Sequence, residues 1–322
     1  MAAAVAMAVA ATPARKRAAP EGSFPAAAVG DSKKRPRYIF GSIYDYEKLG
    51  VLGKGTYGVV VRARHRRTGK MVAVKWVRGT RGGDEDALGA AYLEAACLAA
   101  CRGAPSVLQI RDVVTDGATG DLFLVTELIE GATLRDRIND AGGPFPEPLA
   151  RDYMRQLLRG AAAVHATGTL HRDLKPENVL VGPGGALKIC DFGMATPARP
   201  PYPGDPCAVG TLWYLSPEQL RGSRWYGTAV DVWALGCVMF ELLASVPMFV
   251  DIENEDDLLM EVLHLGHEID SDGVAAFKGL PPDLSQAAGE LLCGLLCVDK
   301  DKRFTAEEAL KHRWFTEEPE GA

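Results

Sequence analysis

The segment His171-Arg172-Asp173-Leu174-Lys175-Pro176-Glu177-Asn178 combines acidic, basic and amide side chains in one proline-containing loop. Four other short motifs flank it in a fixed order along the chain. They are Gly53-Lys54-Gly55-Thr56-Tyr57-Gly58-Val59-Val60, Val72-Ala73-Val74-Lys75, Asp191-Phe192-Gly193 and Ser216-Pro217-Glu218. One glycine-rich match alone would carry little weight, but five motifs in this order are very hard to obtain by chance. Their spacing predicts a single domain built of two lobes.

The polar residues of this loop have the chemistry that transfer of a phosphoryl group requires. A carboxylate must orient the attacking hydroxyl group and accept its proton, and Asp173 fits this role. Asn178 and Asp191 fit as metal ligands, because Mg²⁺ prefers hard oxygen donors and keeps several waters. Lys175 would stabilise the charge of the transferred group. His171 has the side chain of a nucleophile or base, but we interpret it as a packed structural residue.

The glycine-rich motif predicts a strand-turn-strand whose backbone can lie close over phosphates. Side chains at Gly53, Gly55 and Gly58 would block that approach. An ordinary glycine hairpin is the alternative and would be preferred for this motif alone. The context of three strands, with Lys75 seventeen residues after Gly58, favours the phosphate-binding interpretation. The apolar roof over an adenine would then be formed by Leu52, Val60 and Ala73.

Lys75 ends an apolar strand, so its ammonium group faces either solvent or a cleft. A surface lysine is the common case. In the cleft, Lys75 would hold the phosphates of a nucleotide and pair with a carboxylate from a helix. We expect Glu94 to be that partner, because it shares a helix with the inward-facing apolar residues Leu93, Cys97 and Leu98. Glu85 is nearer in sequence but is expected to be solvated in the loop Gly82-Gly83-Asp84-Glu85-Asp86.

The chain of 322 residues has a net charge of −6 that is unevenly distributed. Residues 1–40 hold seven basic and two acidic residues, a net charge of +5, which leaves −11 for the remainder. The alanine and proline content of this tail, with few large apolar side chains, predicts disorder. Its two basic clusters, Arg15–Arg17 and Lys33–Arg37, favour a nuclear over a cytoplasmic location, with a solvated basic tail as the alternative.

Other locations are disfavoured by the sequence. In a secretory signal positive charge precedes the apolar run, whereas here Arg15 follows the uncharged residues 1–12, so an intracellular protein is expected. An organelle transit peptide is a weaker alternative. No apolar stretch reaches the ~18 residues that a membrane span needs. The seven cysteines suit a reducing compartment, and we expect buried thiols rather than a metal site at the pairs Cys97/Cys101 and Cys293/Cys297.

The apolar pattern predicts an α+β fold with a small β-rich lobe and a larger helical lobe. Residues 46–77 alternate or run apolar between glycine turns, which is typical of three strands. A helix is predicted at 87–101, followed by strands at 107–114 and 121–128. From Glu130 onward the pattern is mostly helical, with helices expected at 150–165 and 231–244.

The domain is therefore expected to cover residues 46–315. Residues 46–128 would form the first lobe, with one helix, and residues 129–315 the second. The basic tail is placed at 1–43 and a short C-terminal tail at 316–322.

From Tyr46 to Phe315 the chain resembles the eukaryotic protein kinases, on the motifs quoted above. Leu174-Lys175-Pro176-Glu177-Asn178 with Gly210-Thr211 is similar to the Ser/Thr branch of that family. Thr211-Leu212-Trp213-Tyr214 resembles the cyclin-dependent kinases, and the basic tail with Tyr46-Glu47-Lys48 resembles the F-type members of that group in grasses. The resemblance implies a bilobal protein-kinase fold and transfer of the γ-phosphate of ATP, with Mg²⁺, to Ser/Thr hydroxyls of protein substrates. It implies neither a nucleic-acid substrate nor a membrane partner.

The resemblance also assigns the nucleotide pocket residue by residue. Thr126 would gate its back, and Glu127 to Ile129 would offer backbone groups to the adenine. The remaining contacts to the nucleotide would come from Lys54, Thr56, Tyr57, Val59 and Leu180.

Further positions gain a structural role from the resemblance. Thr211 would form a hydrogen bond near Asp173 and Lys175, and Arg172 would anchor the activation segment. Glu218 and Arg303 would form a buried ion pair. Asp231 could act only as a helix cap, but we expect it also to brace the catalytic loop.

Two departures from the cyclin-dependent kinases concern partners and substrates. The cyclin-contacting helix motif has no counterpart, since the region reads Ala90-Ala91-Tyr92-Leu93-Glu94-Ala95-Ala96, and a cyclin partner is left open. Leu215 replaces the arginine that supports a proline-directed substrate pocket in that group.

Two further features concern regulation. The activating threonine aligns near Pro206 or Cys207, neither of which accepts phosphate, and Asp205 is our candidate for a permanent negative charge beside Arg172. Thr56 and Tyr57 match the inhibitory phosphorylation sites of the cyclin-dependent kinases, or serve only as a lid.

A rival interpretation from another class is a pseudokinase, a scaffold that binds nucleotide or partners without turnover. The polar residues that catalysis would need are all present, which weighs against a pseudokinase. They are Lys75, Glu94, Asp173, Asn178 and Asp191. A small-molecule phosphotransferase would lack the Ser216-Pro217-Glu218 segment and Arg303.

Overall fold

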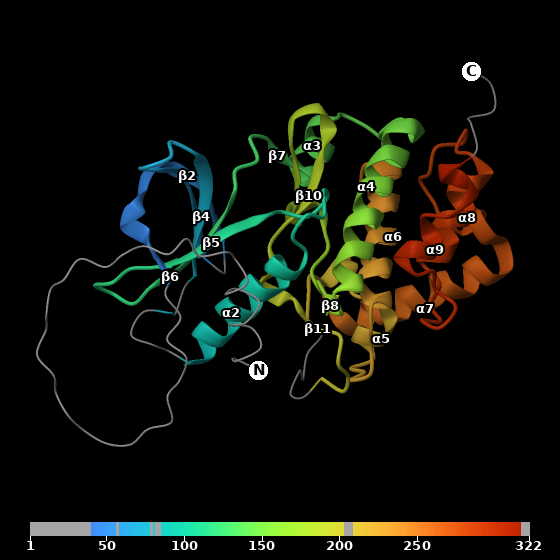
Figure 1. The fold of residues 1–322 in the computed structure, drawn as a ribbon. Helices are drawn as coiled ribbons and strands as arrows, with labels where there is room; N and C mark the ends of the chain where they lie inside the picture. Colours follow the sequence, from blue (N-terminus) through green and yellow to red (C-terminus); the bar gives the residue numbers. More distant parts are fainter. Residues whose placement is uncertain (1–39, 56–57, 78–79, 81–84, 203–208, 317–322) are drawn as a thin grey trace, which may run out of the picture.

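A computed structural model describes residues 40–55, 58–77, 80, 85–202 and 209–316. The predictions made for the basic tail and for Thr56, Tyr57, Asp205, Pro206 and Cys207 lie outside the described residues. The N-lobe precedes the C-lobe along the chain, and Figure 1 shows them side by side, with the sheet at the left and the longer helices at the right.

The N-lobe is built on a six-stranded sheet with the strand order β1-β5-β6-β4-β3-β2. All neighbours pair antiparallel except β1 and β5, which run parallel. The three strands predicted for residues 46–77 are confirmed, as are the two that follow. The strands are β1 (Gly41–Ser42), β2 (Tyr46–Gly55), β3 (Gly58–His65), β4 (Met71–Val77), β5 (Ile110–Thr115) and β6 (Leu122–Glu127).

Alternation along β4 separates the two faces of this sheet, because successive side chains of a strand point to opposite sides. Ala73 and Lys75 point to one side, toward the cleft. Val72 and Val74 point to the other side and join a small buried cluster with Ala63. The sheet therefore presents its lysine to the cleft and keeps an apolar face away from it.

One long helix, α2 (Glu85–Ala100), packs beside this sheet, as predicted for the N-lobe. It starts before the expected residue 87, and Glu85 belongs to its first turn rather than to the preceding loop. Acidic residues are favourable there, because the N-terminal end of a helix carries partial positive charge. Glu85 is nevertheless exposed, as expected. Cys97 and Cys101 are buried in the core, where burial raises the pKa of Cys97 to about 12 and that of Cys101 to about 11.

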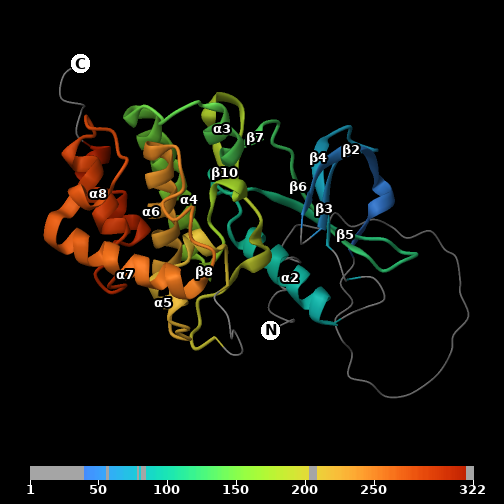
Figure 2. The same cartoon turned by 180° about the vertical axis from the view of Figure 1, so that it is seen from behind.

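The C-lobe is mostly helical, as predicted, and Figure 2 shows its helices from behind. The helix predicted at 231–244 is α6 (Ala229–Ala244), in which every side chain from Val230 to Leu243 is buried. A helix that is buried on all sides belongs at the centre of a lobe. Around it lie α3 (Leu134–Asp140), α4 (Glu147–Ala166), α5 (Pro217–Leu220), α7 (Glu255–Asp272), α8 (Gln286–Leu295) and α9 (Ala306–Ala309).

Two small sheets in this lobe were not predicted. One has the order β10-β9-β7 and the other pairs β11 with β8. Their strands are too short to show an apolar alternation in the sequence. They are β7 (Ala132–Thr133), β8 (Thr169–Leu170), β9 (Val179–Val181), β10 (Leu187–Ile189) and β11 (Thr196–Pro197).

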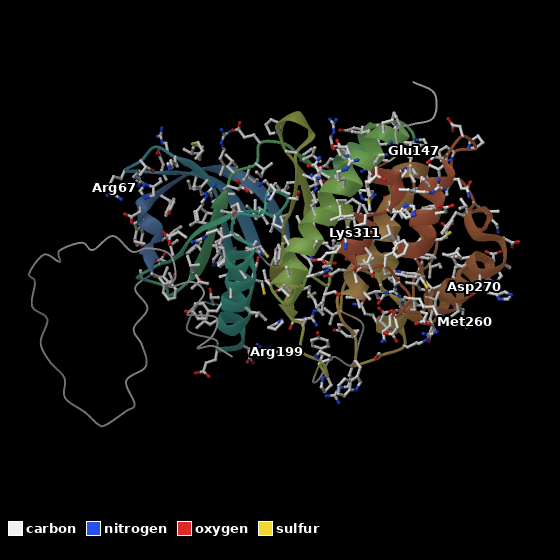
Figure 3. The ribbon with its side chains drawn as sticks, turned by 45° about the vertical axis from the view of Figure 1, so that its right-hand side comes forward. Arg67, Glu147, Arg199, Met260, Asp270 and Lys311 are labelled. Carbon is white, nitrogen blue, oxygen red and sulfur yellow. The ribbon has the colours of Figure 1, made fainter. Side chains whose placement is uncertain are left out.

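Buried charges link distant parts of the C-lobe. The predicted pair of Glu218 and Arg303 is confirmed, with N–O distances of 2.8 and 3.0 Å in a bidentate arrangement. The side chain of Arg303 is fully buried and also donates to the carbonyl oxygen of Ala229. At the start of α4, the labelled Glu147 of Figure 3 accepts hydrogen bonds from Ser285 and Trp314, which ties α4 to the C-terminal helices.

We expect Glu218→Ala to lower the free energy of unfolding by about 3–5 kcal/mol, because it leaves the charge of Arg303 buried and unpaired. Urea unfolding followed by circular dichroism measures this loss. Asp301→Ala, which removes a solvent-exposed partner of Lys300, is the control and should leave the unfolding midpoint unchanged. Equal midpoints for the two variants would contradict a stabilising role for the buried pair.

Candidate active site

The loop of residues 171–178 follows β8 and is held by one carboxylate of α6. Asp231 is 1% exposed and accepts hydrogen bonds from the backbone N–H groups of His171 and Arg172, at 2.9 and 2.8 Å. It also accepts one from Nε2 of His165, at 2.9 Å. Burial alone would raise the pKa of Asp231, but the hydrogen bond and charge of His165 outweigh it, and the pKa is lowered. The predicted bracing role of Asp231 is confirmed.

Arg172 adopts a left-handed backbone conformation, with φ of 65°, which costs a non-glycine residue free energy. The hydrogen bond from its N–H to Asp231 holds this conformation. Its guanidinium group donates to the carbonyl oxygen of Met194, at 2.8 Å, and lies 5.9 Å from the ring centre of Tyr202. The predicted contact of Arg172 with the segment after Asp191 is therefore confirmed.

His171 is 1% exposed, and Nε2 of its ring lies 3.0 Å from the carbonyl oxygen of Cys190. The edge of the ring packs on Phe192, with 4.8 Å between the ring centres. Because its ring atoms are used within the fold, His171 is a structural residue, as predicted.

The proposed catalytic residues meet in a small hydrogen-bonded group. Thr211 donates to Oδ1 of Asp173 at 2.7 Å and accepts from Nζ of Lys175 at 2.5 Å. Lys175 also lies 3.0 Å from Oδ2 of Asp173. The side-chain amide of Asn178 donates to that same Oδ2 at 2.8 Å and to the backbone carbonyl oxygen of Asp173. The carboxylate of Asp173 is therefore held in one orientation by three neighbours.

The two predicted metal ligands lie at the same end of the β9–β10 hairpin. β9 begins directly after Asn178 and β10 ends directly before Cys190 and Asp191, and Val179 pairs with Ile189. The N–H of Cys190 donates to the backbone oxygen of Asn178 at 2.9 Å. An amide oxygen and a carboxylate at one hairpin end fit the oxygen ligands that Mg²⁺ prefers.

Lys75 joins the sheet to both the helix and the hairpin. Its Nζ lies 2.7 Å from Glu94 of α2 and 2.9 Å from Asp191. The predicted pairing with Glu94 is confirmed. Burial lowers the pKa of Lys75, but the charges of the two carboxylates outweigh it and raise the pKa above its ordinary value. Burial raises the pKa of Glu94, while burial of Asp191 is outweighed by Lys75 and the pKa of Asp191 is lowered.

The residues predicted to enclose an adenine come from both lobes. Ala73 and Thr126 are paired neighbours on β4 and β6, and Thr126 is 7% exposed. Leu52 of β2 is half exposed, as an apolar roof over a ligand would be. From the C-lobe, Leu180 alternates with two buried valines on β9 and faces the opposite way. The predicted roles of these residues, and that of Val60, stay predictions. The side chains of Lys54 and Val59 instead line a pocket with Trp76, on the face of the sheet opposite Lys75, so the nucleotide contacts predicted for these two side chains are wrong.

The segment after Thr126 was predicted to offer backbone groups to the adenine, and this stays a prediction. The N–H of Glu127 donates to the carbonyl oxygen of Gln109 at 2.9 Å, so it is used within the fold. The carbonyl oxygen of Glu127 accepts from the hydroxyl group of Thr126. Among the described residues, no backbone hydrogen bond involves the N–H of Ile129, which leaves it as the candidate donor to an adenine.

Gly58 and Gly53 of the glycine-rich strands lack a side chain for different structural reasons. Gly58 has a φ of 153°, and a Cβ there would lie 2.0 Å from the backbone oxygen of Trp76, so the fold itself requires this glycine. A Cβ at Gly53 would meet no atom of the described residues within 4 Å. Packing within the described fold therefore does not require glycine at position 53. A glycine there leaves space on the surface of the strand, as expected for a backbone that approaches phosphates.

One cluster beside the site was not foreseen from the sequence. Arg135 of α3 donates to Glu177 at 2.7 Å, to the hydroxyl oxygen of Tyr214 at 2.8 Å, and to the fully buried Glu241 of α6. Tyr214 donates to Glu241 at 2.8 Å. This cluster ties the catalytic loop to the segment after Thr211. The sequence did contain one indication of this cluster, namely Glu241 within a mainly apolar helix. A charged side chain buried in such a helix needs a partner of opposite charge.

Comparison with known proteins agrees with this geometry. The family model described as "Protein kinase domain" matches residues 46–315. The chain is 42% identical to a protein of Oryza sativa subsp. japonica named "Putative cyclin-dependent kinase F-2", over 84% of this chain and 90% of that protein. It is 36% identical to "Probable cyclin-dependent kinase 10" of Dictyostelium discoideum, over 86% of this chain and 81% of that protein.

A further relative is "Cyclin-dependent kinase G-1" of Oryza sativa subsp. indica, 34% identical over 86% of this chain but only 43% of that protein. This chain belongs to the protein kinase family. It has the bilobal fold of that family. The three relatives are all named as cyclin-dependent kinases, so the chain is similar to members of that group. Within the described part of the chain, no helix combines the length and apolar character of a membrane span.

We expect Lys75→Met to destabilise the fold more at pH 8 than at pH 5. The substitution removes the cation that counteracts the effect of burial on Glu94, so the raised pKa of Glu94 rises further. A carboxyl group whose folded-state pKa is raised loses stability as pH rises through that pKa, and a tenfold change in its proton affinity corresponds to about 1.4 kcal/mol. Urea unfolding at both pH values measures the difference.

Two variants serve as controls for this experiment. Lys70→Met removes an exposed lysine of the β3–β4 turn and should change stability equally at both pH values. Lys75→Met combined with Glu94→Gln should lose most of the pH dependence. If the double variant keeps it, Glu94 is not the group that titrates.

Proposed function

We propose that this chain is a Ser/Thr protein kinase that transfers the γ-phosphate of ATP to a protein hydroxyl group. The single observation that carries the proposal is the group formed by Asp173, Lys175 and Thr211. It holds a carboxylate and an ammonium group side by side, and the neighbouring β9–β10 hairpin carries Asp191, which pairs with Lys75. Phosphoryl transfer depends mainly on such positioning and on neutralisation of charge.

Each residue has one task in this mechanism. Asp173 orients the substrate hydroxyl group and accepts its proton, and the hydrogen bond from Thr211 fixes the carboxylate for that purpose. Lys175 stabilises the negative charge on the transferred group. Lys75 binds the phosphates of the nucleotide and is itself held by Glu94. Mg²⁺, when bound through Asn178 and Asp191, would supply positive charge to the phosphate oxygens.

The Ser/Thr preference rests on Lys175 and Thr211, which the resemblance associates with that branch. Leu215 is 3% exposed, and this buried apolar side chain stands where proline-directed relatives hold an arginine. We propose a relaxed requirement for proline after the phosphorylated residue. A peptide library that differs only at that position tests this proposal.

We also propose that the kinase is active without a cyclin. The ion pair between Lys75 and Glu94 is formed, although α2 lacks the cyclin-contacting motif. Addition of cyclins should therefore leave the rate unchanged. A large rise in the rate of phosphate transfer on addition of a cyclin would refute the proposal that the kinase is active without one.

The nuclear location stays a proposal that rests on the basic clusters of the tail. Imaging of the full chain fused to a fluorescent protein tests it. Replacement of Arg15–Arg17 and Lys33–Arg37 by alanine should then move the protein out of the nucleus.

We expect Asp173→Asn to lower phosphate transfer from γ-labelled ATP by ~10²–10⁴-fold, because the general base is lost. The purified full chain, with itself and a Ser/Thr peptide library as substrates, is the assay. Nucleotide binding, measured by calorimetry with Mg²⁺, should be retained in the variant. Wild-type protein that binds Mg²⁺-ATP but transfers no phosphate, with or without cyclins, would instead support the pseudokinase interpretation.

We expect Thr211→Val to lower kcat by ~10–100-fold with little change in the KM for ATP. The substitution keeps the shape of the side chain but removes the hydroxyl group that joins Asp173 to Lys175, and small errors in positioning reduce rates by such factors. Thr316→Val, at a distant exposed threonine, is the matched control. An unchanged kcat in Thr211→Val would show that the other contacts of Asp173 suffice to hold it.

A further inference from the structure

The N-lobe sheet carries a pocket on the face that points away from the proposed active site. It has a volume of about 450 Å³ and is lined by side chains of β2, β3, β4 and β6. On β4 the lining residues are Val74 and Trp76, which alternate with the cleft-facing Ala73 and Lys75. Figure 2 shows α2 beside this sheet, and within the described residues the 3₁₀ turn η1 (Ile43–Asp45) contributes Ile43 to the lining.

The walls of this pocket are apolar, and its charged lining residues are both basic. The apolar walls include Val51, Val59, Val61 and Phe123, and Val51 is 50% exposed. Lys48 and Lys54 are the charged residues of the lining, and no salt bridge joins either of them to a described residue. The pocket therefore fits a large apolar side chain with acidic residues nearby.

A polar atom in the lining also lacks a partner. Nε1 of Trp76 is buried and, among the described residues, has no hydrogen-bond acceptor. A buried N–H group without an acceptor is unfavourable and is rare in folded proteins. Within the described part of the chain, the indole N–H of Trp76 is thus an unpaired polar group in the wall of the pocket.

The chain itself contains a segment of the required chemistry. The tail is basic overall, but residues 18–32 hold no basic residue and two acidic ones, Glu21 and Asp31. Phe24 lies between them and is the only aromatic residue before Tyr38. Pro20 and Pro25 flank it, and prolines reduce the entropy lost when a segment binds.

The tail also joins the lobe close to the pocket. The described chain begins at Phe40, and Ile43 already lines the pocket. The chain between Phe24 and Ile43 can span up to about 60 Å when extended, so reach is not limiting. Binding within one chain proceeds at an effective concentration that reaches about a millimolar, so a weak contact is sufficient.

We propose that residues 20–31 of the tail dock in this pocket of their own N-lobe. Phe24 enters the apolar pocket between β2 and β4, and the acidic residues on either side face Lys48 and Lys54. The segment thereby covers the exposed apolar face of the sheet opposite the cleft. Such docking does not depend on catalytic activity.

The test is photo-crosslinking in the full chain, with Phe24 replaced by p-benzoylphenylalanine. We expect irradiation to link position 24 to peptides of residues 46–65 or 71–77 within the same molecule, as identified by mass spectrometry. Val51→Glu places a charge in the pocket and should lower the yield at least tenfold. Val246→Glu alters an equally exposed valine of the C-lobe and should leave the yield unchanged.

Several results would overturn the proposal. A link to another surface, or no link, would exclude docking of this segment in the pocket. A link found only between chains in a mixture of ¹⁵N-labelled and unlabelled protein would assign the pocket to a second copy. Crosslinking from position 9 but not from position 24 would assign it to the uncharged residues 1–12. As an independent measurement, hydrogen exchange of residues 18–32 should accelerate in Phe24→Ser, and unchanged exchange would count against the proposal.

Discussion

The carboxylate of Asp231 connects the hydrophobic core of the C-lobe to the loop that carries the proposed catalytic residues. It lies near the start of α6, a helix buried on all sides, and it receives backbone hydrogen bonds from His171 and Arg172. A loop of polar residues has little apolar surface to bury, so its conformation must be imposed by hydrogen bonds. The left-handed backbone of Arg172 persists because this carboxylate holds it. Asp173, the next residue, takes its direction from that turn.

A second constraint joins the two lobes. Lys75 comes from a strand of the N-lobe and contacts Asp191, which follows a hairpin of the C-lobe, and Glu94, which belongs to α2. Three elements distant in sequence are thus brought together by one cation between two carboxylates. Because each of these charges is at least partly withdrawn from water, their mutual attraction is weakly screened and the arrangement is specific. The same cation lowers the pKa of Asp191 and favours its ionised form, which its proposed role as a metal ligand requires.

The elements of the fold could be predicted wherever a sequence pattern was long. The three strands of residues 46–77 and the helix α6 followed from runs of apolar residues with a clear period. The start of α2 was misplaced, because acidic residues such as Glu85 are common both in loops and in the first turn of a helix. The two-residue and three-residue strands of the C-lobe were missed, since a pattern that short has no measurable period.

The proposed active site could likewise be predicted only where its residues belong to local motifs. The residue types in the five motifs predicted Asp173, Lys75 and Asp191 as one site. The structure pairs Lys75 with Asp191 and links Asp173, through Asn178, to the hairpin end beside Asp191. The cluster of Arg135 with Glu177, Tyr214 and Glu241 was not foreseen. Its members are separated by up to about a hundred residues and share no sequence motif.

The sequence by itself determined which chemical groups are present and the family to which the chain belongs, because chemistry depends on residue type and the motifs are local. Only the tertiary structure decided which groups meet, which backbone donors remain for a ligand and which side chains line each face of the sheet. Those properties depend on how the lobes pack, and packing is a property of the whole chain.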